Sequence, residues 1–161
     1  MEKGKAIINF QRLLDKATRF LSSRPRSEKE IKDYLFKKRP RDEELREKVL
    51  VELRALNLIN DKDFVKWWLD QRSTFRPRGE RLLIMELLNK GIAKDLLEEM
   101  VKGKIKEIPL ARKVVLKKER VLTGLPFFKK RQKMGDFLLR RGFSYETVKK
   151  ILDEKFKEKY N

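Results

Sequence analysis

The sequence Arg24-Pro25-Arg26-Ser27-Glu28 returns about 50 residues later as Arg76-Pro77-Arg78-Gly79-Glu80. Proline disfavours the helical conformation of the residue before it, so each copy predicts the end of one helix. Ser27 stands three residues before Glu30, which is the spacing of a capping box that opens the next helix. The two copies therefore predict the same turn between two helices at two places in the chain.

A second pair of segments extends this repetition toward the C-terminus. Leu87-Leu88-Asn89-Lys90-Gly91-Ile92 aligns with Leu138-Leu139-Arg140-Arg141-Gly142-Phe143. In both, a helical pattern ends in polar or basic residues followed by glycine, which is a typical helix stop. A period near 50 residues indicates an internal repeat. We predict three repeats, with boundaries at 1–59, 60–105 and 106–161.

The hydrophobic spacing is helical throughout. Ile7, Phe10, Leu14, Ala17 and Leu21 recur at steps of three and four, so they share one face of the first helix. No stretch shows the strict alternation that is typical of a strand. The predicted helices are the first through Leu21, 28–38, one capped by Asp42, one from Asn60 or Asp61 to Phe75, 80–90, a short one around Leu96–Val101, one after Ile108-Pro109, 129–141, and 145 to about 160.

Repeats of this size are too small to bury a sufficient core alone. Neighbouring repeats are therefore expected to share apolar surface. We predict an all-α protein of three tandem three-helix repeats, helix-turn-helix-like in character, that form an elongated and curved molecule.

The composition is strongly basic. The 161 residues include 43 Lys and Arg against 25 Asp and Glu, a net charge of +18, yet 40% of the chain is hydrophobic. Such a chain can form a core, and its charge favours a polyanionic or acidic partner. The N-terminus lacks the apolar core of a signal peptide, and no stretch is long enough to span a bilayer. We expect a cytoplasmic protein that does not associate with membranes.

The chain contains no Cys and no His. Disulfides, thiol nucleophiles, Cys/His zinc sites and Ser-His-Asp relays are therefore excluded. The seven glycines form no phosphate-binding loop or dinucleotide fingerprint. Asp61 is interpreted as a helix N-cap and Asp63 as a first-turn charge. We predict no catalytic residue, metal site or cofactor, and hence a protein that is not an enzyme.

Clustered Lys and Arg are the candidate contacts to a polyanion. Guanidinium groups bind phosphate and carboxylate through paired hydrogen bonds. Two thirds of the excess positive charge lies from residue 102 onward. The candidates are Arg24, Arg26, Arg76, Arg78, Lys117, Lys118, Lys129, Lys130, Arg131, Lys133, Arg140 and Arg141. Two alternatives stay open: the loop arginines cap helix ends and pair with Glu28 and Glu80, and the remaining charges only keep the protein in solution.

Aromatic residues offer a second kind of contact, because rings can stack on unpaired bases. Packing within or between repeats is the favoured interpretation. Adjacent helical positions differ by about 100° in direction, so we expect one of Trp67 and Trp68 to be buried and the other to lie at a boundary between repeats. The aromatic candidates are Trp67-Trp68, Phe75, Phe127-Phe128, Phe137 and Phe143.

Several of these segments together resemble the RecX family. The resemblance rests on Arg24–Ile31, Leu56–Phe64, Arg72–Gly79 and Glu86–Ile92, and it covers roughly residues 17 to 160. In the third repeat, Phe127-Phe128-Lys129-Lys130 replaces the Arg-Pro-Arg loop. The resemblance implies tandem three-helix repeats.

The resemblance also implies a function. It implies a monomeric regulator that binds the filament of the RecA recombinase on DNA and suppresses ATP hydrolysis and strand exchange, in recombination, repair and the SOS response. It further implies weak binding to single-stranded DNA and weaker binding to duplex. Two alternatives stay open: a stand-alone helix-turn-helix DNA-binding protein, which would bind duplex tightly and selectively, and a basic helical RNA-binding protein.

Overall fold

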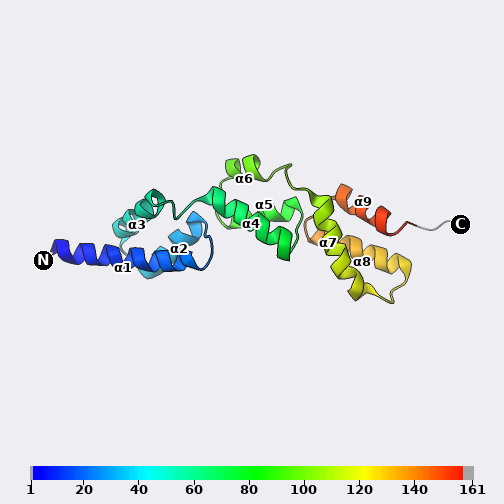
Figure 1. Cartoon of the computed structure of the whole chain (residues 1–161), viewed down its shortest axis with the longest axis horizontal. Helices are drawn as coiled ribbons and strands as arrows, with labels where there is room; N and C mark the ends of the chain where they lie inside the picture. The colour runs from blue at the N-terminus through cyan, green and yellow to red at the C-terminus, as the bar shows by residue number, and fades with distance from the viewer. Residues whose placement is uncertain (1, 158–161) are drawn as a thin grey trace. The chain divides into compact units, whose positions relative to one another are not determined.

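The computed structural model describes residues 2–157. Within this range it contains nine α-helices, one short 3-10 helix and no strand (Figure 1), which confirms the all-α prediction. The helices are α1 (Glu2–Ser22), α2 (Glu28–Lys38), α3 (Glu43–Ala55), α4 (Asp61–Phe75), α5 (Glu80–Asn89), α6 (Lys94–Met100), α7 (Glu107–Glu119), the 3-10 helix η1 (Arg120–Leu122), α8 (Phe127–Arg140) and α9 (Tyr145–Lys155).

The N-termini of α2 and α3 are capped as the sequence predicts. The Ser27 hydroxyl accepts a hydrogen bond from the Glu30 N–H, and the Glu30 carboxylate accepts one from the Ser27 N–H, both at 3.2 Å. Asp42 accepts a hydrogen bond from the Leu45 N–H at 3.1 Å. These caps are local, because donor and acceptor lie within one turn, and for that reason the sequence suffices to predict them.

Two boundaries in the third repeat differ from the prediction. Helix α8 begins at Phe127 rather than Lys129, because Pro126 already stands at the N-cap and the helix continues directly from it. Helix α9 ends at Lys155, where Phe156 leaves the helical conformation and buries its ring in the core. The predicted end near Tyr160 lies outside the described residues.

The start of α4 corrects the interpretation of Asp61. Its cap is Asn60, whose side-chain oxygen accepts hydrogen bonds from the N–H groups of Lys62 at 2.9 Å and Asp63 at 3.4 Å. Asp61 is the first helical residue, and its carboxylate accepts a hydrogen bond from the Glu28 N–H at 2.9 Å. Asp61 thus caps α2, a helix remote in sequence. Burial raises the pKa of Asp61.

The chain divides into two compact units. The first comprises Met1–Trp67 and Asn89–Ala93. Among the α1 side chains that the structure describes, only Leu13 and Ala17 are fully buried. Ile7, expected on the same face, is 68% exposed because the helix extends past the core. The buried core residues are Leu13, Ala17, Ile31, Leu35, Leu45, Val49, Leu50, Leu53 and Ile59.

The second unit comprises Trp68–Leu88 and Lys94–Asn161. Its α7, α8 and α9 enclose a core that also takes in Leu122 of η1. The buried core residues are Ala111, Val114, Val115, Leu122, Met134, Leu138, Phe143, Val148, Ile151 and Phe156.

Neither tryptophan of the Trp67-Trp68 pair is fully buried, which corrects the expectation that one would be. Trp67 lies 5.8 Å from the Phe64 ring, with the Arg24 guanidinium 5.5 Å from its own ring. Trp68 donates a hydrogen bond to Glu86 at 3.0 Å. Both rings are half-buried and lie beside charged side chains, Arg24 for Trp67 and Glu86 for Trp68.

Candidate functional site

The second Arg-Pro-Arg loop is held against the end of α8. Gly79 donates its N–H to the Arg141 carbonyl at 2.9 Å. The two glycines, Gly79 and Gly142, meet so closely that a Cβ on Gly79 would lie 2.2 Å from the Gly142 carbonyl carbon. Because any side chain at position 79 would clash there, this contact requires glycine. The corresponding position of the first loop holds Ser27.

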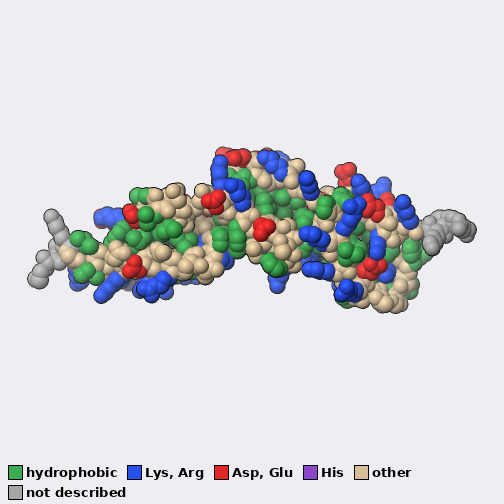
Figure 2. Space-filling model, in the orientation of Figure 1, with side chains coloured by type: hydrophobic (Ala, Val, Ile, Leu, Met, Phe, Trp, Pro, Cys, Tyr) green, Lys and Arg blue, Asp and Glu red, His purple; other side chains and the backbone are tan. Residues whose placement is uncertain are grey.

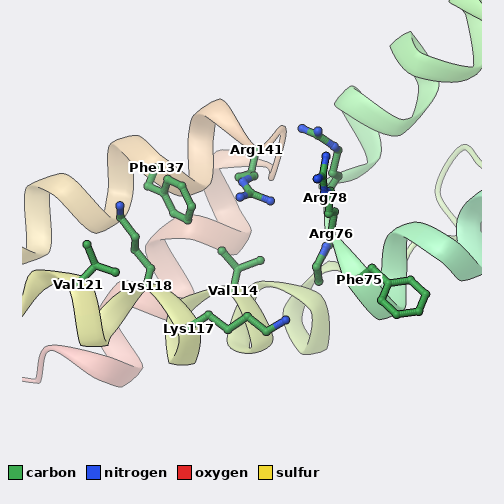
Figure 3. A pocket seen from close by; sticks show the side chains of 10 residues that line it. Phe75, Arg76, Arg78, Val114, Lys117, Lys118, Val121, Phe137 and Arg141 are labelled. Atoms are coloured by element: carbon green, nitrogen blue, oxygen red, sulfur yellow. The ribbon is translucent and has the colours of Figure 1, made fainter.

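Arg141, whose carbonyl accepts the hydrogen bond from Gly79, also lines a cleft of about 390 Å³ in the second unit. Arg76 and Arg78 of the loop and Arg141 at the end of α8 face one another across it (Figure 3). Five cations line the cleft: Arg76, Arg78, Lys117, Lys118 and Arg141. Its apolar lining is Phe75, Pro77, Val114, Val121 and Phe137, and no Asp or Glu stands among the described lining residues.

One carboxylate behind the cleft neutralises part of this charge. Glu86 of α5 pairs with Arg78 and with Arg72, in each case at 2.7 Å. Arg76 and Lys117 are exposed and form no ion pair with any described residue. The cleft therefore retains uncompensated positive charge.

The effect of this charge is visible at Arg141. Burial lowers the pKa of its guanidinium, and the neighbouring Arg78 and Arg76 lower it further. Lys118 and Arg141 also flank the Phe137 ring, at 4.7 and 4.9 Å from its centre. Like charges held together on an aromatic support repel one another until an anion enters, so the arrangement favours anion binding.

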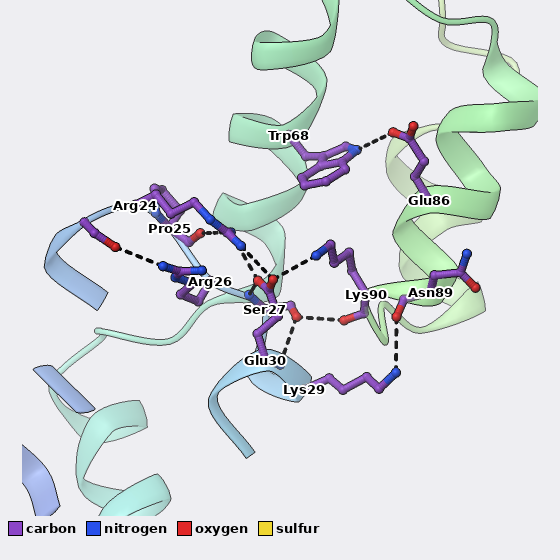
Figure 4. Close-up of polar contacts among 11 residues, drawn as sticks. Arg24, Pro25, Arg26, Ser27, Lys29, Glu30, Trp68, Glu86, Asn89 and Lys90 are labelled. Atoms are coloured by element: carbon purple, nitrogen blue, oxygen red, sulfur yellow. Dashed lines mark hydrogen bonds and ion pairs between the residues drawn. The ribbon is translucent and has the colours of Figure 1, made fainter. Parts of the chain in front are cut away.

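The first Arg-Pro-Arg loop has a different role. Arg24 forms a bidentate pair with Glu30, at 2.7 and 3.2 Å (Figure 4). Lys90 joins the same carboxylate at 2.9 Å, and the Ser27 hydroxyl donates to the Lys90 carbonyl at 2.7 Å. Burial alone would raise the pKa of Glu30, but hydrogen bonds from Arg24, Lys90 and Ser27 lower it to about 2.

The other arginine of that loop is also engaged. Arg26 lies 4.0 Å from the Phe20 ring centre and donates to the Ser23 hydroxyl at 2.9 Å. Phe20 in turn stacks on Tyr34 at 4.2 Å. Burial and the nearby Arg24 lower the pKa of Arg26. Both arginines of the first loop thus make contacts within the first unit, and the carboxylate that pairs with Arg24 is Glu30 rather than the expected Glu28.

The remaining candidates of the third repeat lie on α8, outside the cleft. Lys130 pairs with Glu119 at 3.7 Å and Arg131 with Asp153 at 2.8 Å. Lys129, Lys133 and Arg140 are exposed and form no ion pair with a described residue. Over α7, α8 and α9, Lys and Arg side chains are visible at many points with fewer Asp and Glu between them (Figure 2).

Some of the aromatic candidates also line the cleft, and others lie elsewhere. Phe75 lies at the edge of the cleft and is 66% exposed. Phe137 lines the cleft beneath Lys118 and Arg141, whereas Phe143 is buried in the core. Phe127 contacts both Phe128 and Phe156 edge-on, at 5.6 and 5.9 Å. Only Phe75 and Phe137 accompany the clustered cations.

Four exposed cations of α1 were not among the predicted contacts. Lys5, Arg12, Lys16 and Arg19 are exposed and form no ion pair with a described residue. Their positions recur at helical spacing, so they share one face of α1. They are not adjacent in sequence, so a search for clustered Lys and Arg does not find them. Their helical spacing is the signal that could have identified them.

No cluster of three potential metal-ligating side chains occurs in the described part of the chain. None of the helices described here combines the length and apolar character of a bilayer-spanning segment.

Three family models match the chain in consecutive order. They describe the first three-helix domain of RecX over residues 14–53, the second over 60–101 and the third over 107–152. The chain is 32% identical over 149 residues to a Regulatory protein RecX of Prosthecochloris aestuarii, an alignment that covers 89% of this chain and 93% of that protein.

Other relatives give the same result. A Regulatory protein RecX of Streptococcus uberis is 30% identical over 152 residues, which cover 94% of this chain but only 58% of that longer protein. The crystal structure of RecX from Lactobacillus salivarius superimposes with a TM-score of 0.77 at 22% identity, covering 92% of this chain and 97% of that one. This chain and that RecX protein therefore share the same fold.

Proposed function

Because this chain belongs to the RecX family of regulatory proteins, we propose that it binds the RecA–single-stranded DNA filament and lowers RecA's ATP hydrolysis and strand exchange. It does so as a monomer without catalytic chemistry of its own, in the cytoplasm, in recombination and DNA repair. DNA contributes to the binding through its phosphates, and the filament strengthens an affinity that is weak for DNA alone.

The observation that carries the DNA part of this proposal is the cationic cleft. Arg76, Arg78 and Arg141 converge there with Lys117 and Lys118, and no lining carboxylate in the described chain opposes them. Exposed Arg76 and Lys117 are free to meet a backbone phosphate, whereas Arg78 is held in place by Glu86. Phosphate binding would relieve the repulsion around Arg141 and release counterions from the DNA.

The regulatory part follows from contact with more than one RecA protomer. Consecutive repeats of one chain would bridge neighbouring protomers. A bridge of this kind opposes the relative movement of protomers that each ATP cycle requires. ATP turnover and strand exchange fall together because both depend on that movement.

The DNA contact is tested by titrating labelled single-stranded oligonucleotide at several salt concentrations. The double variant Arg76→Ala/Lys117→Ala should weaken binding and reduce the salt slope by about 1.4, since each single-strand phosphate contact contributes about 0.7. Lys94→Ala/Lys149→Ala removes the same charge from exposed positions elsewhere in the same unit and should leave the slope nearly unchanged. Equal slopes for both double variants would contradict the assignment of the cleft.

The regulatory activity is tested by RecA ATP hydrolysis on single-stranded DNA at increasing concentrations of this protein. Turnover should fall to a plateau, and the cleft variant should need more protein to reach it. Unchanged turnover and filament length at saturating protein would overturn the proposal. Tight, sequence-selective binding to duplex without RecA would instead support a stand-alone helix-turn-helix protein.

A further inference from the structure

The first unit contains a groove of about 810 Å³ between α1 and α3 whose chemistry is opposite to that of the cationic cleft. Its apolar side chains include Ile7 and Phe10 of α1 and Leu45 and Val51 of α3. Of these, Ile7 is 68% and Val51 59% exposed. The groove therefore presents apolar surface that the first unit's own core leaves uncovered.

The polar lining of this groove is acidic. Asp42 caps α3, and Glu44 and Glu47 lie along it. Among the described lining residues the single cation is Lys48, which is paired with Glu44 at 2.6 Å. Glu47 forms no ion pair with any described residue. In a chain of net charge +18 this is a local excess of negative charge. It repels phosphate and attracts cations.

The spacing of these residues fits a helical ligand. Glu44, Glu47 and Val51 recur at steps of three and four along α3, so they form one ridge about 10 Å long, or two helical turns. Residues of α1 supply the facing ridge. Two helices that leave an apolar groove with charged margins are the usual receptor for an amphipathic helix.

We propose that the α1–α3 groove binds one basic amphipathic helix of a protein partner. The partner's apolar stripe covers Ile7 and Val51, and its Lys or Arg side chains pair with Glu44 and Glu47. Charge complementarity selects this occupant, since a nucleic acid would bring phosphates against three carboxylates. This inference does not depend on the DNA-binding role proposed for the cleft, which lies in the other unit.

The probe is a fluorescein-labelled Leu/Lys peptide of about 14 residues, which forms about four turns of basic amphipathic helix. Its anisotropy is followed with the full chain at about 150 mM salt, where long-range attraction is screened. Glu47→Lys places a cation where the peptide brings its own, and Val51→Lys places a cation against the peptide's apolar stripe. Each should weaken binding about tenfold or more. Both positions are exposed, so thermal melts should match the wild type.

The matched control is Leu116→Lys, which makes the same kind of change at a 63% exposed position on α7. It should leave peptide binding unchanged. The inference is overturned if the peptide does not bind, or if Val51→Lys binds it as tightly as the wild type. It is also overturned if light scattering shows a dimer that Val51→Lys converts to monomer, because the occupant would then be a second copy of this chain.

Discussion

The carboxylate of Asp61 accepts a hydrogen bond from the backbone N–H of Glu28 at 2.9 Å. Glu107 accepts one from the N–H of Glu80 at the same distance. Asp61 and Glu107 open α4 and α7, the first helices of the second and third repeats, whereas Glu28 and Glu80 open α2 and α5. In each pair an acid at the start of one repeat caps the second helix of the preceding repeat.

This relationship predicts an effect on stability. Asp61→Ala leaves the half-buried Glu28 N–H without its acceptor and should lower the free energy of unfolding by about 1–2 kcal/mol. Asp63→Ala is the matched control, because Asp63 stands in the same helical turn and its carboxylate forms, among the described residues, only an exposed 3.9 Å pair with Lys66. Its cost should stay below about 0.5 kcal/mol. Urea denaturation measures both, and equal costs would rule out the cap.

The close contact of α8 with α5 predicts a second effect. Gly142 has φ +85°, and a Cβ there would lie 2.4 Å from the Leu82 Cβ. Gly142→Ala should therefore cost about 1 kcal/mol for the left-handed conformation and a further 2 kcal/mol or so for the clash. Gly124→Ala separates the two causes, since Gly124 has φ +83° with nothing within 4 Å. If both variants melt at the same temperature, the contact is not as close as described.

The paired carboxylates predict an acid-dependent loss of stability. Hydrogen bonding to Arg54 chiefly lowers the pKa of Glu28 to about 2, and the pKa of Glu30 is also lowered to about 2. Both carboxyls are thus more acidic in the folded chain than in the unfolded one. Their contribution is fully present above the ordinary value of 4.5 and is lost as pH falls from 4.5 toward 2.

Replacement of the better-buried acid tests this dependence. Glu30→Gln should be less stable than the wild type at pH 7, and the two unfolding free energies should converge as the pH approaches 2. Glu43→Gln removes the same charge from an exposed position without an ion pair to a described residue, and its curve should run parallel to the wild type. A constant gap between Glu30→Gln and the wild type across this range would contradict the lowered pKa.

The repulsion within the cationic cleft predicts that binding and stability respond differently to one substitution. Arg141→Ala removes a cation whose pKa is lowered by burial and by Arg78 and Arg76, so the melting temperature at low salt should not fall. Its single-stranded DNA affinity should fall, with a salt slope smaller by about 0.7. Arg140→Ala alters the neighbouring exposed residue outside the cleft and should change that slope less. If Arg140→Ala reduced the salt slope more than Arg141→Ala, the DNA contact would lie outside the cleft.

Helix boundaries were predictable where the signal is local. Ser27 with Glu30, and Gly142 after α8, determine a cap and a stop through atoms within one turn of each other. The prediction for Asp61 was wrong because its acceptor oxygen bonds to a residue 33 positions away in the chain. No local pattern distinguishes an acid that caps its own helix from one that caps another.

The sequence by itself determined an all-α chain of three similar repeats, because helical spacing, prolines and glycines act over a few residues. Only the tertiary structure decided what the repeated arginines do. Arg24 and Arg76 begin the same motif, yet Arg24 is neutralised by Glu30, while Arg76 lines a cleft with Lys117 and Arg141 that contains no carboxylate from the described part of the chain. The difference arises because a charge is neutralised or concentrated by the side chains that folding brings within a few ångströms, and these come from distant parts of the chain.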